Sequence, residues 1–172
     1  MKLIVTGATG FIGSEVLRQC IANPEVTSVL VVSRREPAKE LMAFPKVKVI
    51  LHEDFSEWPA SLLDQLEGAE GCIWYLNTNW KSQASLTLLQ RTVGGKVSDF
   101  PNIETARKVG IDYTLAAAQA FATNLAPRLA DVGRKFSFVF CSGYGAEQKE
   151  DARVWLYAGS RKLKVCWCAA GR

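Results

Sequence analysis

Apolar runs alternate with amphipathic, helix-like stretches along most of this 172-residue chain. The apolar residues 3–6 predict a short strand, and the helical pattern that follows ends near Ala22 because Asn23-Pro24 disfavours further helix. The run SVLVV at 28–32 is typical of a parallel strand that is buried on both faces. That strand is predicted over 26–35, and further strands are predicted at 46–54, 71–76 and 135–145, the last ending in a small-residue turn. Helices are predicted at 37–44, 61–66, 84–91, 102–125 and 147–164.

This alternation predicts βαβ units. Strand and helix follow one another at the spacing of a doubly wound parallel sheet of about five strands with helices on both faces, the Rossmann-type α/β fold. No internal repeat or low-complexity linker interrupts the pattern. We therefore expect one domain over residues 1–164 and an irregular tail over residues 165–172.

Three glycines separate the first strand from the first helix. Gly7, Gly10 and Gly13 form a Gly-x-x-Gly-x-x-Gly pattern within VTGATGFIGSEVL. In this context the first glycine allows a tight turn, the second allows close approach of a pyrophosphate, and the third lets the helix pack against the strand. The amides and the positive dipole end of the helix then face the phosphates. A tight turn without a ligand is the alternative.

Other candidate cofactor residues follow the ends of later strands, where ligands bind in such sheets. Arg34 after the second strand favours the 2′-phosphate of NADP(H) over NAD(H), with Arg35 as a second clamp, although both could be a solvated basic loop. Asp54 and the adjacent backbone could meet the adenine amino group, or Asp54 could be a turn residue. The predicted cofactor-binding residues are Thr6, Gly7, Thr9, Gly10, Phe11, Ile12, Gly13, Arg34, Arg35, Asp54, Phe55, Leu76 and Asn77.

Charge and composition narrow the function classes. The formal net charge is +4, with −3 on residues 1–70 and +7 on the remainder, but no helix carries a dense basic stripe. We therefore expect no nucleic-acid partner. The five cysteines, the lone His52 and the absence of a secretory leader favour reduced thiols in the cytoplasm and no metal site. No apolar run approaches the ~20 residues that span a bilayer, so we expect no membrane partner.

TGATGFIG at 6–13, followed by SRR at 33–35, resembles the short-chain dehydrogenase/reductase superfamily, in particular its extended and atypical branches with epimerase/dehydratase-like members. This resemblance covers residues 1–164 and implies a dinucleotide-binding sheet with redox, epimerase or dehydratase chemistry. FVFCSGYG at 138–145 is similar to the family's fifth strand. The similarity implies that Ser142 polarises the substrate oxygen.

The family's catalytic pair is a tyrosine and a lysine four residues later on one helix face, and the resemblance implies that Tyr157 takes the first role. Arg161, not lysine, stands four residues on. Either Tyr157 and Arg161 form a variant pair, or the tyrosine role is absent and Lys164 or Lys162 only holds the cofactor. Tyr144 is a further candidate proton donor.

Family members continue beyond the last predicted helix, whereas this chain stops soon after Lys164, so a C-terminal truncation is expected. Trp155, Val165 and Trp167 could then form a homodimer surface or cover the edge of their own sheet. Three functions remain open. They are an NADP(H)-dependent oxidoreductase or epimerase-like enzyme acting on a small carbonyl or hydroxyl substrate, a catalytically silent dinucleotide sensor or scaffold, and an inactive fragment.

Overall fold

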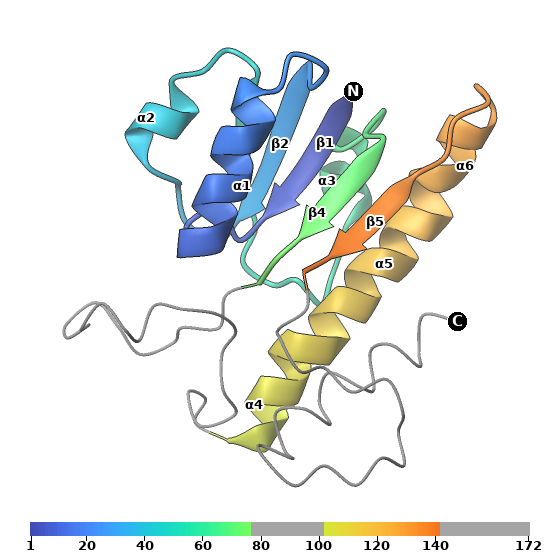
Figure 1. The fold of residues 1–172 in the computed structure, drawn as a ribbon. Helices are drawn as coiled ribbons and strands as arrows, with labels where there is room; N and C mark the ends of the chain where they lie inside the picture. Colours follow the sequence, from blue (N-terminus) through green and yellow to red (C-terminus); the bar gives the residue numbers. More distant parts are fainter. Residues whose placement is uncertain (77–101, 142–172) are drawn as a thin grey trace, which may run out of the picture. The chain divides into compact units, whose positions relative to one another are not determined.

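A computed structural model describes residues 1–76 and 102–141 (Figure 1). The chain divides into two compact units. The first comprises Met1–Tyr75 and Ala116–Cys141, and the second comprises Leu76–Leu115 and Ser142–Arg172. The predicted domain boundary at residue 164 and the predicted helices at 84–91 and 147–164 lie outside the described residues.

The first unit is built on a parallel sheet of five strands, as the sequence predicts. The strands are β1 (Lys2–Thr6), β2 (Ser28–Ser33), β3 (Val47–Leu51), β4 (Gly71–Trp74) and β5 (Ser137–Phe140). Their spatial order is β3-β2-β1-β4-β5. The chain therefore reverses its direction of travel across the sheet between β1 and β4, and the carboxyl ends of these two strands flank the switch point.

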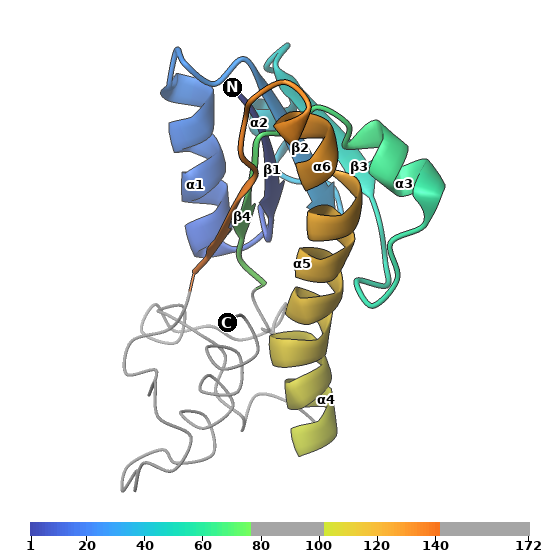
Figure 2. The ribbon, with the colours of Figure 1, turned by 90° about the vertical axis from the view of Figure 1, so that its right-hand side faces the viewer.

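Helices cover both faces of this sheet (Figure 2). On one face lies α1 (Phe11–Ala22), and on the other lie α3 (Ala60–Gln65), the later turns of α5 (Tyr113–Asn124) and α6 (Ala126–Ala130). The short α2 (Lys39–Met42) joins β2 to β3. The doubly wound Rossmann-type architecture predicted from the sequence is thus confirmed.

Two apolar layers hold the helices to the sheet. Under α1 the cluster is aliphatic, because β-branched residues of the strands meet Leu17 and Cys20 of the helix. The opposite layer is aromatic: Trp74 of β4 and Phe121 of α5 are both fully buried. The Trp58 ring lies 4.7 Å from that of Phe121, centroid to centroid, in an edge-on contact. These layers bury both faces of the central strands β1, β2 and β4, as a parallel sheet requires.

The helix predicted over residues 102–125 is present, and it contains a π-helical turn. In the second unit, α4 (Ile103–Arg107) passes into a π-helical turn at Lys108–Asp112 before α5 begins. Asn102 caps α4, because its side-chain oxygen accepts a hydrogen bond of 2.8 Å from the Thr105 amide. Gly110 lies in the π-helical turn, where the normal i→i−4 ladder is widened by one residue. Helix α6 was not predicted; proline stands in its first turn, which proline tolerates.

Candidate functional site

The glycine turn after β1 adopts a backbone that a side chain would obstruct. Gly7 has φ of +68°, in the left-handed region that favours glycine. A Cβ atom on Gly7 would overlap the carbonyl oxygen of Tyr75, the residue that follows β4. A Cβ on the buried Gly13 would overlap the carbonyl oxygen of Gly7. The tight turn and the close helix packing that the sequence predicts for these two glycines are therefore confirmed.

The N-terminus of α1 opens directly from this turn. Gly10 is its N-cap residue, no side chain caps the helix, and no acidic residue stands in its first turn. The Gly10 amide donates to the Gly7 carbonyl at 2.9 Å, so the turn is closed on itself. The first amides of a helix have no intrahelical acceptor and carry the positive end of the dipole. The arrangement is suited to an anion such as a pyrophosphate.

The other predicted residues of this segment have distinct surroundings. The hydroxyl of buried Thr6 accepts from the Tyr75 amide at 3.0 Å and donates to the Tyr75 carbonyl at 3.3 Å. Thr6 therefore ties the end of β1 to the end of β4. Thr9 is exposed in the turn, Phe11 is 67% exposed, and Ile12 is half-buried.

The basic pair follows β2 on the neighbouring side of the turn. Thr6 at the end of β1 is in register with Val32 of β2, so Arg34 emerges at the same edge of the sheet. Arg34 and Arg35 are both exposed, and within residues 1–76 and 102–141 neither forms an ion pair. The Arg35 amide lies 3.4 Å from Ser33 Oγ, which accepts its hydrogen bond. Both guanidinium groups are thus at the surface, where they could meet a phosphate.

The stretch after β3 forms a turn with a packed aromatic ring. Asp54 Oδ1 accepts hydrogen bonds from the Ser56 amide at 2.9 Å and the Ser56 hydroxyl at 2.6 Å. These contacts give Asp54 the turn role that the sequence left open beside adenine binding. Phe55 is 3% exposed and packs edge-on against Trp74. Its ring belongs to the aromatic layer, so only its backbone could meet a ligand.

The described residues include Leu76 but none of the predicted catalytic residues. Leu76 follows Tyr75 directly and is half-buried. Asn77 lies outside the described residues. So do the residues assigned to catalysis by resemblance, Ser142, Tyr157, Arg161 and Lys164, together with Tyr144 and Lys162.

Sequence reasoning missed two side chains at the carboxyl edge, Tyr75 and Cys141. Tyr75 packs against the glycine turn, and Cys141 extends β5 by one residue, with its amide donating to the Trp74 carbonyl at 3.0 Å. Burial, and then the nearby Cys141 thiol, raise the pKa of Tyr75. The signal available in the sequence was positional, because each residue lies toward the end of a predicted strand.

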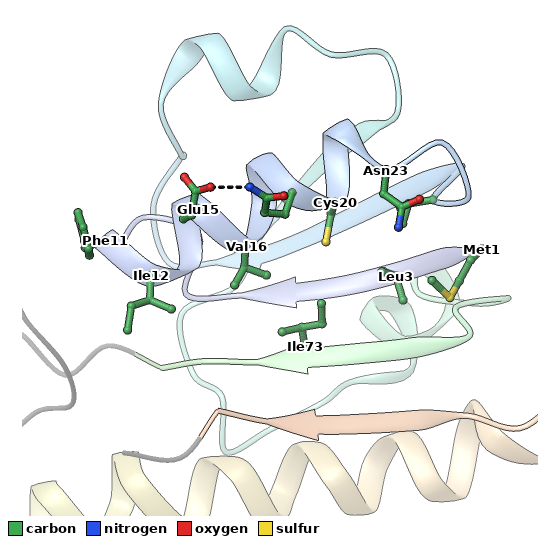
Figure 3. A pocket seen from close by; sticks show the side chains of 11 residues that line it. Met1, Leu3, Phe11, Ile12, Glu15, Val16, Cys20, Asn23 and Ile73 are labelled. Carbon is green, nitrogen blue, oxygen red and sulfur yellow. Dashed lines mark hydrogen bonds between the residues drawn. The ribbon is translucent and has the colours of Figure 1, made fainter. Parts of the chain in front are cut away.

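An apolar groove of about 450 Å³ runs along α1 and was also missed (Figure 3). Ile12 and Val16 of α1 and Ile73 of β4 point into it, beneath a 2.8 Å hydrogen bond between the Gln19 and Glu15 side chains. Cys20 lines the same groove, and burial raises the pKa of its thiol. The groove borders the first turn of α1 but consists mainly of aliphatic side chains.

Among residues 1–76 and 102–141, no three His, Cys, Asp or Glu side chains are placed to hold a metal ion. No helix in that part of the chain combines the length and apolarity needed to span a bilayer.

Comparisons with known proteins show which sequences and folds this chain is similar to. Residues 3–64 match the family model described as "Polysaccharide biosynthesis protein". Solved structures similar to the chain include a short-chain dehydrogenase family protein from Francisella tularensis, with a TM-score of 0.58, 15% identity, and coverage of 99% of this chain and 60% of that one. The chain has the fold of the short-chain dehydrogenases/reductases. The resemblance seen in its sequence is confirmed.

Two further comparisons show how much of each similar protein's length the chain covers. A dTDP-glucose 4,6-dehydratase from Bacillus anthracis, solved in complex with NAD, gives a TM-score of 0.54 at 12% identity. The match covers 96% of this chain and 49% of the dehydratase. "Leucinostatins biosynthesis cluster protein T" of Purpureocillium lilacinum is 29% identical over 145 residues, which are 84% of this chain and 44% of the relative. The chain thus spans about half the length of these relatives.

Proposed function

We propose that this chain binds NADP(H) at the carboxyl edge of its sheet and acts as an oxidoreductase or epimerase-like enzyme on a small carbonyl or hydroxyl substrate. The observation that carries the proposal is the glycine cradle, which we define as the turn at residues 7–10 together with the start of α1 through Gly13. Side chains at Gly7 and Gly13 would overlap backbone atoms, and α1 begins there without a cap or an acidic residue. The same shape leaves the amides open to a pyrophosphate. The NAD complex of the similar dehydratase supports a dinucleotide of this kind.

The preference for NADP(H) rests on Arg34. A 2′-phosphate needs a cation at the end of β2, where an NAD-selective site carries an acidic residue. Arg34 is exposed there, with no ion pair among the described residues, and Arg35 would act as a second clamp. Asp54, the Phe55 backbone, Leu76 and Asn77 would complete the cofactor contacts.

The chemistry would come from the segment after β5. When bound, the nicotinamide supplies hydride transfer. Ser142 would donate a hydrogen bond to the substrate oxygen, and Tyr157 would exchange a proton with it. Arg161, a permanent cation, would stabilise the phenolate, with Lys164 holding the cofactor.

A catalytically silent sensor or scaffold is the second candidate. Arginine at position 161, in place of the family's lysine, favours it. A silent protein would bind NADP(H) without turnover, and its affinity for a partner protein would depend on the cofactor. We further propose that the chain acts in the cytoplasm and forms a homodimer, without nucleic-acid or membrane partners.

A thermal-shift titration with NADP⁺ and NAD⁺ tests the binding proposal. Ligand at 100 times its Kd should add about 2.7 kcal/mol of stability to the wild type. Arg34→Ala should lose most of the NADP⁺ shift and keep the NAD⁺ shift. Arg18→Ala, which removes a half-exposed arginine of α1, is the matched control and should keep both. No shift with either dinucleotide would refute the proposal.

Measurement of NADPH consumption then distinguishes the enzyme from the catalytically silent sensor. If NADPH binds and is consumed with carbonyl compounds, Ser142→Ala and Tyr157→Phe should each abolish most of the rate. If NADPH binds and no carbonyl compound is reduced, the silent-sensor proposal takes precedence.

A further inference from the structure

Tyr75 is held beside the glycine turn by its backbone. Its amide and its carbonyl are both bound by the Thr6 hydroxyl, at 3.0 and 3.3 Å. The ring lies against the turn, because its Cδ1 atom is 3.1 Å from the position that a Cβ of Gly7 would take. Tyr75 is therefore fixed in place at the switch point between β1 and β4, where ligands bind in open α/β sheets.

The phenol hydroxyl of Tyr75 has no hydrogen-bond partner in the part of the chain that the structure describes, where its contacts with Thr6 involve only the backbone. The residue is nevertheless only 8% exposed. Buried polar groups are almost always hydrogen-bonded in native proteins. A hydroxyl that no group of residues 1–76 and 102–141 binds, on a buried residue next to the start of α1, is suited to donate to a bound ligand.

Cys141 lies next to Tyr75 at the same edge. Its amide bonds to the Trp74 carbonyl at 3.0 Å, which continues the β4–β5 pairing by one residue beyond Trp74 and Phe140. Cys141 is an exposed free thiol. Burial, and then the Cys141 thiol, raise the pKa of Tyr75, so the phenol keeps its proton and is available as a donor.

The strand order puts Tyr75 and Cys141 on the side of the turn where the nicotinamide half of the proposed dinucleotide would lie. Arg34 follows β2, the glycine turn follows β1, and Tyr75 and Cys141 follow β4 and β5 on the opposite side of the turn. A dinucleotide whose 2′-phosphate meets Arg34 and whose pyrophosphate lies on the turn must extend its nicotinamide nucleotide toward β4 and β5.

We propose that the Tyr75 hydroxyl donates a hydrogen bond to an oxygen of the nicotinamide-nucleotide half, and that this half covers the Cys141 thiol. The inference rests on the proposed function, since it assumes a bound dinucleotide. It adds a ligand contact at Tyr75 and a ligand-shielded thiol at Cys141.

Calorimetry with two probes tests the Tyr75 contact. NADP⁺ contains both halves of the ligand, whereas adenosine 2′,5′-bisphosphate lacks the nicotinamide nucleotide. Tyr75→Phe should weaken NADP⁺ binding about three- to tenfold, the value of one neutral hydrogen bond, and leave bisphosphate binding unchanged. The melting temperature of the ligand-free variant should equal or exceed that of the wild type, because no group of the described residues binds the hydroxyl that is removed.

Alkylation by iodoacetamide, followed by peptide mass spectrometry, tests the second contact. NADP⁺ should slow the labelling of Cys141, and the bisphosphate should not. Cys72, which is 1% exposed, is the internal reference and should stay unlabelled throughout.

The outcomes separate this inference from the proposed function. Equal NADP⁺ affinity of wild type and Tyr75→Phe, or a clearly lower melting temperature of the free variant, would overturn the role of Tyr75 while cofactor binding stands. Unprotected Cys141 in saturating NADP⁺ would overturn the second contact alone. A wild type that binds neither probe refutes the proposed function and this inference with it.

Discussion

At the scale of single residues, backbone contacts decide which glycine is indispensable. Gly7 and Gly68 both have positive φ, at +68° and +74°. A Cβ on Gly68 would meet nothing within 4 Å, whereas one on Gly7 would overlap the Tyr75 carbonyl. The two positions therefore separate the cost of the left-handed backbone from the cost of steric overlap.

Gly7→Ala and Gly68→Ala should differ accordingly in chemical denaturation. We expect Gly68→Ala to lower the free energy of unfolding by about 1 kcal/mol, the cost of placing alanine at positive φ. Gly7→Ala should cost about 4 kcal/mol or more, because β4 must also move, and dinucleotide binding should be lost. Equal destabilisation by the two variants would show that the Tyr75 carbonyl leaves room for a side chain at Gly7.

Thr6 is the second residue-scale test, because its hydroxyl serves two buried backbone groups. Thr6→Val keeps the shape of the side chain but leaves the amide and carbonyl of Tyr75 without a partner. The free energy of unfolding should fall by about 2 kcal/mol. Thr6→Ser keeps the hydroxyl and should recover at least half of that loss. If Thr6→Val unfolds like the wild type, another group must bind the Tyr75 backbone.

At the scale of elements, the start of α1 is left uncapped, and this has opposite consequences for stability and for binding. Gly10 has φ of −92° and ψ of 167°, an extended conformation that aspartate adopts readily. Aspartate at an N-cap accepts hydrogen bonds from the first-turn amides and interacts favourably with the helix dipole. A bound pyrophosphate needs those same amides.

Gly10→Asp should therefore raise the free energy of unfolding by about 1 kcal/mol and abolish NADP⁺ binding. Thermal unfolding and calorimetry on the same sample measure the two effects. Pro59→Asp is the control, because Pro59 is the N-cap of α3 and also makes no side-chain capping bond. It should leave NADP⁺ affinity unchanged. Undiminished binding by Gly10→Asp would argue against a phosphate at this helix end.

Element boundaries were predictable where local signals were strong. Asn23-Pro24 ended α1 as expected, and the β-branched run of β2 was placed within a few residues. The π-helical turn between α4 and α5 was not predicted, because the helical periodicity of residues 102–125 continues through it. Only one extra residue in the hydrogen-bond ladder distinguishes such a turn from α-helix, and local sequence encodes this weakly.

At the scale of the whole molecule, the aromatic layer joins segments that are far apart in the sequence. Phe121 of α5 lies 4.7 Å from the Trp58 ring and 6.2 Å from the Phe138 ring, centroid to centroid. It is fully buried. This layer therefore connects α5, β5 and the segment before α3, and much of the stability of the sheet unit should depend on it.

Phe121→Ala should lower the free energy of unfolding by about 4 kcal/mol, through lost burial and a cavity that the surrounding rings cannot fill. Val132→Ala is the control, because Val132 is 68% exposed; its effect should stay within about 0.5 kcal/mol. Urea denaturation of both variants measures the difference. A loss below about 1 kcal/mol for Phe121→Ala would mean that the layer repacks.

The sequence by itself determined the parallel sheet, the glycine turn and the basic pair after β2. Periodicity and glycine spacing express local rules, and continuous apolar strands can be buried only in a sheet covered on both sides. Tertiary structure alone decided that Gly7 meets Tyr75, that Thr6 is a clamp, that Phe55 is core, and that a buried phenol stands beside the cradle. These features depend on β4 lying next to β1 across about seventy residues of chain, a contact that no local pattern specifies.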